Sequence, residues 1–137
     1  LIKKNFKIFS YCSDDPVLCK RLEDLGCEVV MPLVSPIGSG LGIRNEHNLE
    51  LIRSMCKGLI FVDAGIGRPS DACRIMELGF DGVLLNSSVA RSHDPINMAE
   101  AMSLAVKSGR KSFLSGAIKK TKKAIASTTF KGKISNF

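Results

Sequence analysis

The sequence has no apolar run close to the roughly 20 residues that a membrane-spanning helix needs. Residues 1–6 carry neither the apolar segment nor the cleavage site of a secretory signal peptide. They also lack an initiating methionine, so we expect a fragment or a processed chain. We expect a cytoplasmic protein, with the plastid stroma as the other compartment that fits.

The cysteines lack the spacing of a metal site or a disulfide framework. There are five, an odd number, and no two stand at C-x-x-C spacing. Most fall within apolar segments, where a cysteine behaves as a small buried thiol in a reducing compartment. We therefore expect free cysteines, no metal and no cofactor.

Acidic residues are missing from the C-terminal part of the chain. Between Lys107 and Lys133 there are nine Lys or Arg and no Asp or Glu, while the whole chain has a net charge of +7. Residues 111–137 are therefore expected to form a basic tail, which is either solvated or able to contact phosphate or an acidic partner. No aromatic residues alternate with the lysines, and no nucleic-acid-binding motif is present, which argues against nucleic acid.

Apolar residues make up 45% of the chain, which is enough for a core. Their pattern predicts strands at 7–11, 28–31, 59–62 and 82–85, and helices at 16–25, 46–57, 70–78 and 95–107. Ser13 or Asp14 is expected to cap the first helix, and the strand at 59–62 is expected to be buried on both faces. Strands that alternate with helices form a parallel sheet with right-handed crossovers. Four such units fit half of a (β/α)8 barrel or a small open doubly wound sheet.

The strongest functional signal is the segment 62–72, which ends an apolar run, turns on two glycines and starts a helix. Free N–H groups at such a helix start attract an anion. Asp63 stands where the strand would open into a site, so it is a candidate acid or base. Two simpler interpretations stay open: the glycines serve only the turn, and Asp63 only caps it.

Two other loops carry small or polar residues at strand ends. Residues 86–88, Asn-Ser-Ser, follow the last predicted strand, and residues 38–42 contain three glycines that let the backbone approach a ligand. The alternative for the glycine-rich loop is a flexible surface loop. No G-K-[ST] follows, so this is not a nucleotide P-loop. Tyr11 and Cys12 end another strand and would lie at the same mouth, whereas His47 and His93 are expected on the surface.

Taken together, these segments resemble thiazole synthase of thiamine biosynthesis, in order from about residue 5 to residue 110. The resemblance is carried by residues 11–16, 31–33, 35–40, 42–45, 62–67, 69–72 and 81–86. It implies an α/β fold in which residues 1–110 form the C-terminal half of a (β/α)8 TIM barrel, with four parallel strands alternating with helices. Residues 111–137 would follow as the basic tail.

The resemblance also implies a reaction. A transferase of this family joins 1-deoxy-D-xylulose 5-phosphate, dehydroglycine and sulfur into a thiazole phosphate, and the sulfur arrives as a thiocarboxylate on a small sulfur-carrier protein. A family lysine forms a Schiff base with the sugar ketone. That lysine belongs to a strand before Lys7, so we expect this chain to be inactive alone and the full-length family members to be homo-oligomers.

Six residues match functional positions of the family. Asp63 matches a proposed acid/base carboxylate. The sugar-phosphate contacts are matched by Gly38, Ala64, Gly65, Asn86 and Ser87. Val34, Arg68 and the segment 91–93 depart from the family pattern, which bears on catalysis more than on phosphate binding.

Two other functions remain open: another sugar-phosphate-binding barrel enzyme, and a non-catalytic fragment whose basic tail binds a partner. Half a barrel would leave two strand edges and one side of the barrel core exposed. We therefore expect the isolated chain to be poorly stable or to self-associate.

Overall fold

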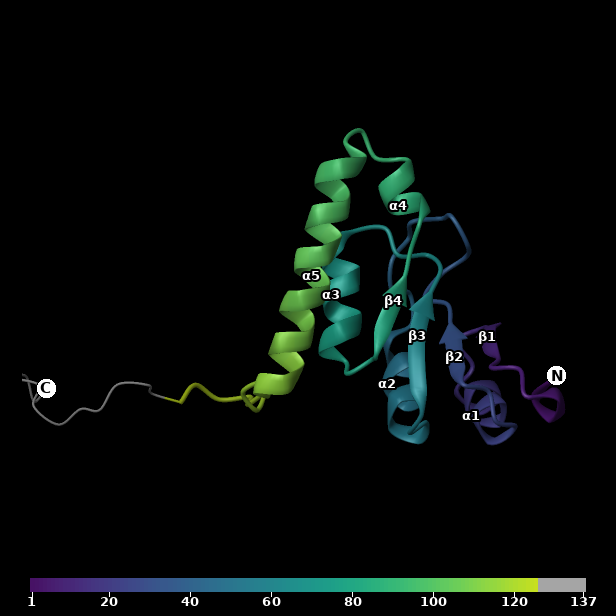
Figure 1. The fold of residues 1–137 in the computed structure, drawn as a ribbon. Coiled ribbons are helices and arrows are strands. Elements are labelled where there is room, and N and C mark those ends of the chain that lie inside the picture. Colours follow the sequence, from purple (N-terminus) through teal and green to yellow (C-terminus); the bar gives the residue numbers. More distant parts are fainter. Residues whose placement is uncertain (126–137) are drawn as a thin grey trace, which may run out of the picture.

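A computed structural model describes residues 1–125 of the chain (Figure 1). Its parallel strands are β1 (Phe9–Cys12), β2 (Val29–Pro32), β3 (Leu59–Asp63) and β4 (Gly82–Leu84). The helical segments are η1 (Ile2–Lys4), α1 (Pro16–Asp24), α2 (Glu46–Met55), α3 (Pro69–Glu77), α4 (Ser87–Ala90) and α5 (Pro95–Ser115). The predicted alternation of strands and helices is confirmed.

The strand order decides between the two architectures that the sequence left open. Neighbouring strands follow chain order, β1-β2-β3-β4, with no reversal. A doubly wound sheet reverses its order at a switch point, whereas a barrel adds each strand beside the last one. The four βα units therefore have the arrangement of half a barrel. In Figure 1 the strands run upward, and α4 lies near the upper end of β4.

One face of the sheet is packed against helices, and the other is partly exposed along β1, β3 and β4, whereas β2 is buried on both faces. On β3, Ile60 and Val62 are buried, but Leu59 is 47% exposed. The expectation that this strand is buried on both faces is therefore wrong, because no described part of the chain covers its second face. We call this surface the open face; its exposed apolar side chains are Phe9, Tyr11, Leu59 and Leu84.

The first helix begins at a different cap from either expected residue. Asp15, rather than Ser13 or Asp14, accepts hydrogen bonds from the backbone N–H groups of Val17 (2.8 Å) and Leu18 (3.3 Å). Because Pro16 occupies the first helical position, where no free N–H is needed, Asp15 stands at the N-cap itself. The sequence alone could not distinguish Asp14 from Asp15 as the cap, because the two are adjacent and of the same residue type.

The last helix extends to Ser115, beyond the expected end at Lys107. Gly109 lies inside α5, where that helix runs alongside α3 (Figure 1). A Cβ at residue 109 would lie 2.3 Å from the carbonyl oxygen of Cys73 on α3. The glycine therefore permits close helix packing instead of ending the helix. The expected tail at 111–137 begins inside α5, and its residues 126–137 lie outside the described residues.

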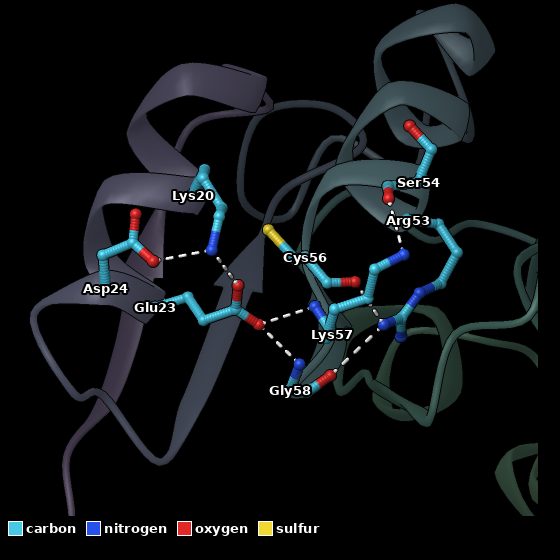
Figure 2. Close-up of polar contacts among 8 residues, drawn as sticks. All are labelled: Lys20, Glu23, Asp24, Arg53, Ser54, Cys56, Lys57 and Gly58. Carbon is cyan, nitrogen blue, oxygen red and sulfur yellow. Dashed lines mark hydrogen bonds and ion pairs between the residues drawn. The ribbon is translucent and has the colours of Figure 1, made fainter.

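At the N-terminal end of β3, a carboxylate holds the turn that starts the strand (Figure 2). Glu23 on α1 accepts hydrogen bonds from the backbone N–H groups of Lys57 (2.7 Å) and Gly58, and its other oxygen pairs with Lys20 at 2.9 Å. Arg53 donates to the carbonyl oxygens of Cys56 (2.7 Å) and Gly58 (3.3 Å). These bonds fix where β3 begins.

All five cysteines are free, as expected. Cys12 on β1 and Cys19 on α1 are buried with their sulfur atoms 3.6 Å apart. This contact closes the space between the first strand and its helix. In the described part of the chain, no helix is both long and apolar enough to cross a membrane.

Candidate functional site

A pocket of about 230 Å³ lies at the C-terminal ends of β3 and β4. All six site residues predicted from the sequence line it: Gly38, Asp63, Ala64, Gly65, Asn86 and Ser87. Ile37, Gly40, Ile66, Leu84 and Leu85 complete the lining. Three separate loops therefore converge on one cavity, at the end of the sheet where barrel enzymes place their chemistry.

The wall of the pocket is made by two loops that interlock. The loop between β2 and α2 meets the loop between β3 and α3 through the side chain of Ser35, which is only 2% exposed. Its hydroxyl donates to the carbonyl oxygen of Gly65 at 3.1 Å, and the N–H of Gly42 donates to the same oxygen at 2.9 Å. The N–H of Val34 donates to the carbonyl oxygen of Ala64 at 3.3 Å.

Close contact between these loops explains two of the glycines. A Cβ at Gly65 would lie 2.0 Å from the hydroxyl oxygen of Ser35, and one at Gly67 would lie 2.1 Å from the carbonyl oxygen of Gly40. The glycines therefore serve more than the turn, because they allow two backbone segments to touch. Ala64 adopts a left-handed φ of 76°, which is uncommon for a residue with a Cβ.

The sequence predicted free backbone N–H groups at the start of α3, but the structure has its free N–H groups at other positions. At the start of α3, the side chain of Asp71 accepts from the N–H groups of Gly67 (3.1 Å) and Arg68 (2.9 Å), so these donors are occupied. Within residues 1–125, the N–H groups of Gly65, Ile66 and Ser87 donate to no protein acceptor. All three residues line the pocket. Unpaired N–H groups at the wall of a cavity favour an anionic ligand.

Asp63 stands on the final position of β3 and is half-buried. Burial raises the pKa of its carboxyl, and the nearby N–H of Ala64 opposes that rise. The pKa of Tyr11 is raised mainly by burial and to a smaller degree by the charge of Asp63. A carboxyl whose pKa lies above its ordinary value is a better proton carrier near neutral pH.

The other residues singled out in the sequence lie elsewhere. His47 and His93 are exposed and do not line this pocket, as expected. Cys12 is buried beneath α1 instead of opening into the cavity. Ser35, which ties the two loops together, was not anticipated; its signal was a serine immediately before the glycine-rich loop. Among the described residues, no cluster of His, Cys, Asp or Glu could hold a metal ion.

Comparison with known families agrees with this geometry. The family model described as "Thiazole biosynthesis protein ThiG" matches residues 1–129. The chain belongs to the thiazole synthase family. The family's role is thiamine biosynthesis, and its pattern extends over the strands, the pocket loops and α5.

Individual thiazole synthases are similar along nearly the whole chain. That of Sorangium cellulosum is 53% identical over 134 residues, which cover 98% of this chain and 52% of the relative. The thiazole synthase of Geobacter sulfurreducens gives the same identity and coverage. The chain therefore spans about half the length of the curated relatives it matches.

This chain also covers about half of each solved structure that it matches here. The Amycolatopsis orientalis BexX/CysO complex aligns with a TM-score of 0.84 and 27% identity, covering 89% of this chain and 50% of the other. The (S)-3-O-geranylgeranylglyceryl phosphate synthase of Thermoplasma acidophilum aligns with a TM-score of 0.62 and 15% identity, covering 49% of that chain. At that identity the second likeness concerns the fold alone. Both agree with the half-barrel arrangement of the strands.

Proposed function

We propose that this chain supplies the phosphate-binding half of a thiazole synthase and that its pocket holds the phosphate of 1-deoxy-D-xylulose 5-phosphate. The observation that carries the proposal is the set of unpaired N–H groups at Gly65, Ile66 and Ser87 in the pocket wall. A phosphate offers oxygen acceptors to donors on two neighbouring loops at once. The loops after successive strands are where barrel enzymes commonly hold phosphate.

Asp63 is proposed as the group that moves protons on the bound sugar. It lies in the same pocket as the phosphate donors, and its raised pKa favours exchange between the acid and carboxylate forms. No lysine lines the pocket within residues 1–125. The described lining therefore offers no amine for a Schiff base, and we propose that the chain binds the sugar phosphate without converting it.

The proposed partner is a small sulfur-carrier protein that delivers sulfur as a thiocarboxylate. Support comes from the similarity of this chain to the Amycolatopsis orientalis protein that is in complex with CysO. The complete reaction would form a thiazole phosphate, a transferase activity that requires both halves of the barrel.

Calorimetric titration of the 137-residue chain with 1-deoxy-D-xylulose 5-phosphate tests the binding step. The sugar phosphate is expected to bind, inorganic phosphate to compete with it, and unphosphorylated 1-deoxy-D-xylulose to bind at least tenfold more weakly, because the backbone donors recognise the anion. Asn86→Ala and Ser87→Ala should weaken binding, whereas Ser103→Ala, on the exposed face of α5, should not. Equal binding of the phosphorylated and unphosphorylated sugars would contradict the proposal.

A second measurement tests the missing lysine. Treatment of the chain and sugar phosphate with borohydride should leave no covalent adduct, since no imine forms. An adduct seen by mass spectrometry would show that a lysine of this chain performs the step.

A further inference from the structure

Arg91 lies beside the pocket residue Gly38, in a segment that departs from the family pattern. Its backbone N–H donates to the carbonyl oxygen of Ser87 at 3.0 Å and closes the single turn of α4. Residues 87 and 91 are therefore one helical turn apart and share a face. That face is turned toward Gly38 on the loop between β2 and α2.

Two distances measured from Gly38 locate the side chains of Ser87 and Arg91. A Cβ there would lie 3.7 Å from the hydroxyl oxygen of Ser87 and 4.0 Å from a terminal nitrogen of Arg91. Gly38 and Ser87 both line the pocket. The Arg91 guanidinium therefore stands at the rim of the cavity, beside the wall that carries Ser87.

The described residues that line the pocket include no cation. Among the residues that line the pocket, only Asp63 is ionisable, and its charge repels a phosphate. Within residues 1–125, Arg91 forms no ion pair with an acidic side chain, and its guanidinium makes no hydrogen bond. Arg91 is thus a cation beside an anion-binding wall, with its donors uncommitted.

We propose that Arg91 is a phosphate-binding and specificity-determining residue of this pocket, whose guanidinium engages the phosphate dianion held by Gly65 and Ser87. The inference rests on the proposed function, since that function puts a phosphate there. A guanidinium presents paired N–H donors that match two phosphate oxygens, and its charge favours a dianion over a neutral or singly charged group. Backbone N–H groups alone would discriminate less between these charges.

The left-handed glycine opposite is part of the same arrangement. Gly38 has a φ of 72°, a conformation that L side chains rarely adopt, and an added Cβ would be in ordinary van der Waals contact with Ser87 and Arg91. The backbone of Gly38 therefore lies within side-chain reach of both groups.

The test compares two variants that remove the same charge. Arg91→Gln should weaken binding of 1-deoxy-D-xylulose 5-phosphate and of inorganic phosphate about tenfold by calorimetry, and should reduce the salt dependence of binding. Arg21→Gln, on the exposed surface of α1 and away from the pocket, should leave both unchanged. Arg91→Lys should retain part of the affinity, because lysine keeps the positive charge but lacks the paired N–H donors of a guanidinium.

The outcomes separate this role from the proposed function. If the unchanged chain binds phosphate and Arg91→Gln binds it equally well, Arg91 has no role and the pocket assignment stands. If Arg21→Gln lost as much phosphate affinity as Arg91→Gln, the affinity would depend only on net charge, and the proposal would be overturned. If the unchanged chain binds no phosphate, both the proposed function and the role of Arg91 fall.

Discussion

The hydroxyl of Ser35 donates to the carbonyl oxygen of Gly65 at 3.1 Å and occupies the space that a Cβ on residue 65 would need. One hydrogen bond thus joins two loops and restricts the residue type at the pocket wall. A Cβ would also lie 2.5 Å from the Ser35 carbonyl oxygen, which belongs to the backbone and cannot rotate away.

Gly65→Ala should therefore destabilise the chain by about 2–4 kcal/mol, which combines backbone strain at a φ of 83° with the steric overlap. Gly116→Ala is the matched control, since Gly116 also has a left-handed φ (75°) but nothing within 4 Å of an added Cβ. Urea denaturation should show a loss near 1 kcal/mol for the control. Equal losses in the two variants would show that contact with Ser35 is unimportant.

Ala64→Gly should behave unlike an ordinary alanine-to-glycine change. Ala64 holds a φ of 76°, and the relief of that strain, about 1–2 kcal/mol, offsets the greater freedom of glycine in the unfolded chain. We expect a change in unfolding free energy between zero and about 1 kcal/mol of stabilisation. Ala99→Gly, in the exposed part of α5, should instead cost about 1 kcal/mol. A similar cost for both would refute the strain argument.

Asp63→Asn should make the chain more stable at neutral pH while it removes the proposed proton carrier. Burial raises the folded-state pKa of Asp63, so the folded chain binds this proton more tightly than the unfolded chain does. The stability due to Asp63 is therefore present at low pH and is lost as pH rises through the raised pKa. Between pH 4 and pH 7, the denaturation midpoint of the unchanged chain should fall relative to that of Asp63→Asn, because the variant lacks the titrating carboxyl. A less stable variant at pH 7 would indicate that the carboxylate mainly caps the turn.

Glu23 should give the opposite pH dependence. Burial, the largest single influence, raises its pKa, but the bonds from Lys20, Gly58 and Lys57 together outweigh burial and lower the pKa. Its stabilising contribution is thus complete above the unfolded-state pKa of about 4.3 and disappears as pH falls through the lower folded value. Glu23→Gln should cost about 1–2 kcal/mol at pH 7, and the difference should shrink in acid. A difference that is constant with pH would exclude this role.

The open face leads to a prediction about association. Phe9 and Tyr11 on the edge strand β1 are 57% and 44% exposed, and β1 presents an unpaired edge. The isolated chain should elute from size-exclusion chromatography as a concentration-dependent oligomer. Phe9→Lys should shift it toward the monomer, whereas Val17→Lys, exposed on α1, should not. A sharp monomer with a cooperative melting transition would contradict this expectation.

Much of the fold could be predicted, because the spacing of apolar residues and the glycines that follow helices are local properties of the chain. The six pocket residues could be found for a related reason: they follow strand ends, and parallel strands end on one edge. The features that were missed depend on tertiary contact. The last helix continues past Lys107 because Gly109 packs closely against the Cys73 carbonyl of α3, and the four residues of α4 are too few to show a helical period.

The side-chain burial of β3 was also beyond local pattern. Leu59 and Ile60 are both apolar, yet one is exposed and the other buried, because the described residues cover only one face of the sheet at β3. The relatives that this chain matches over 134 residues are about twice its length. A local apolar run does not reveal which face of its strand the rest of a fold covers.

The interlocked loops have a consequence for the speed and cost of binding. In a planar trans peptide, the carbonyl of one residue and the N–H of the next point in opposite directions. Ser35 and Gly42 hold the Gly65 carbonyl, and Val34 holds that of Ala64, so the N–H groups of Ile66 and Gly65 are aimed before any ligand arrives. A ligand would then meet a rigid receptor and lose little affinity to ordering the loop. Association at this wall should proceed in a single kinetic phase.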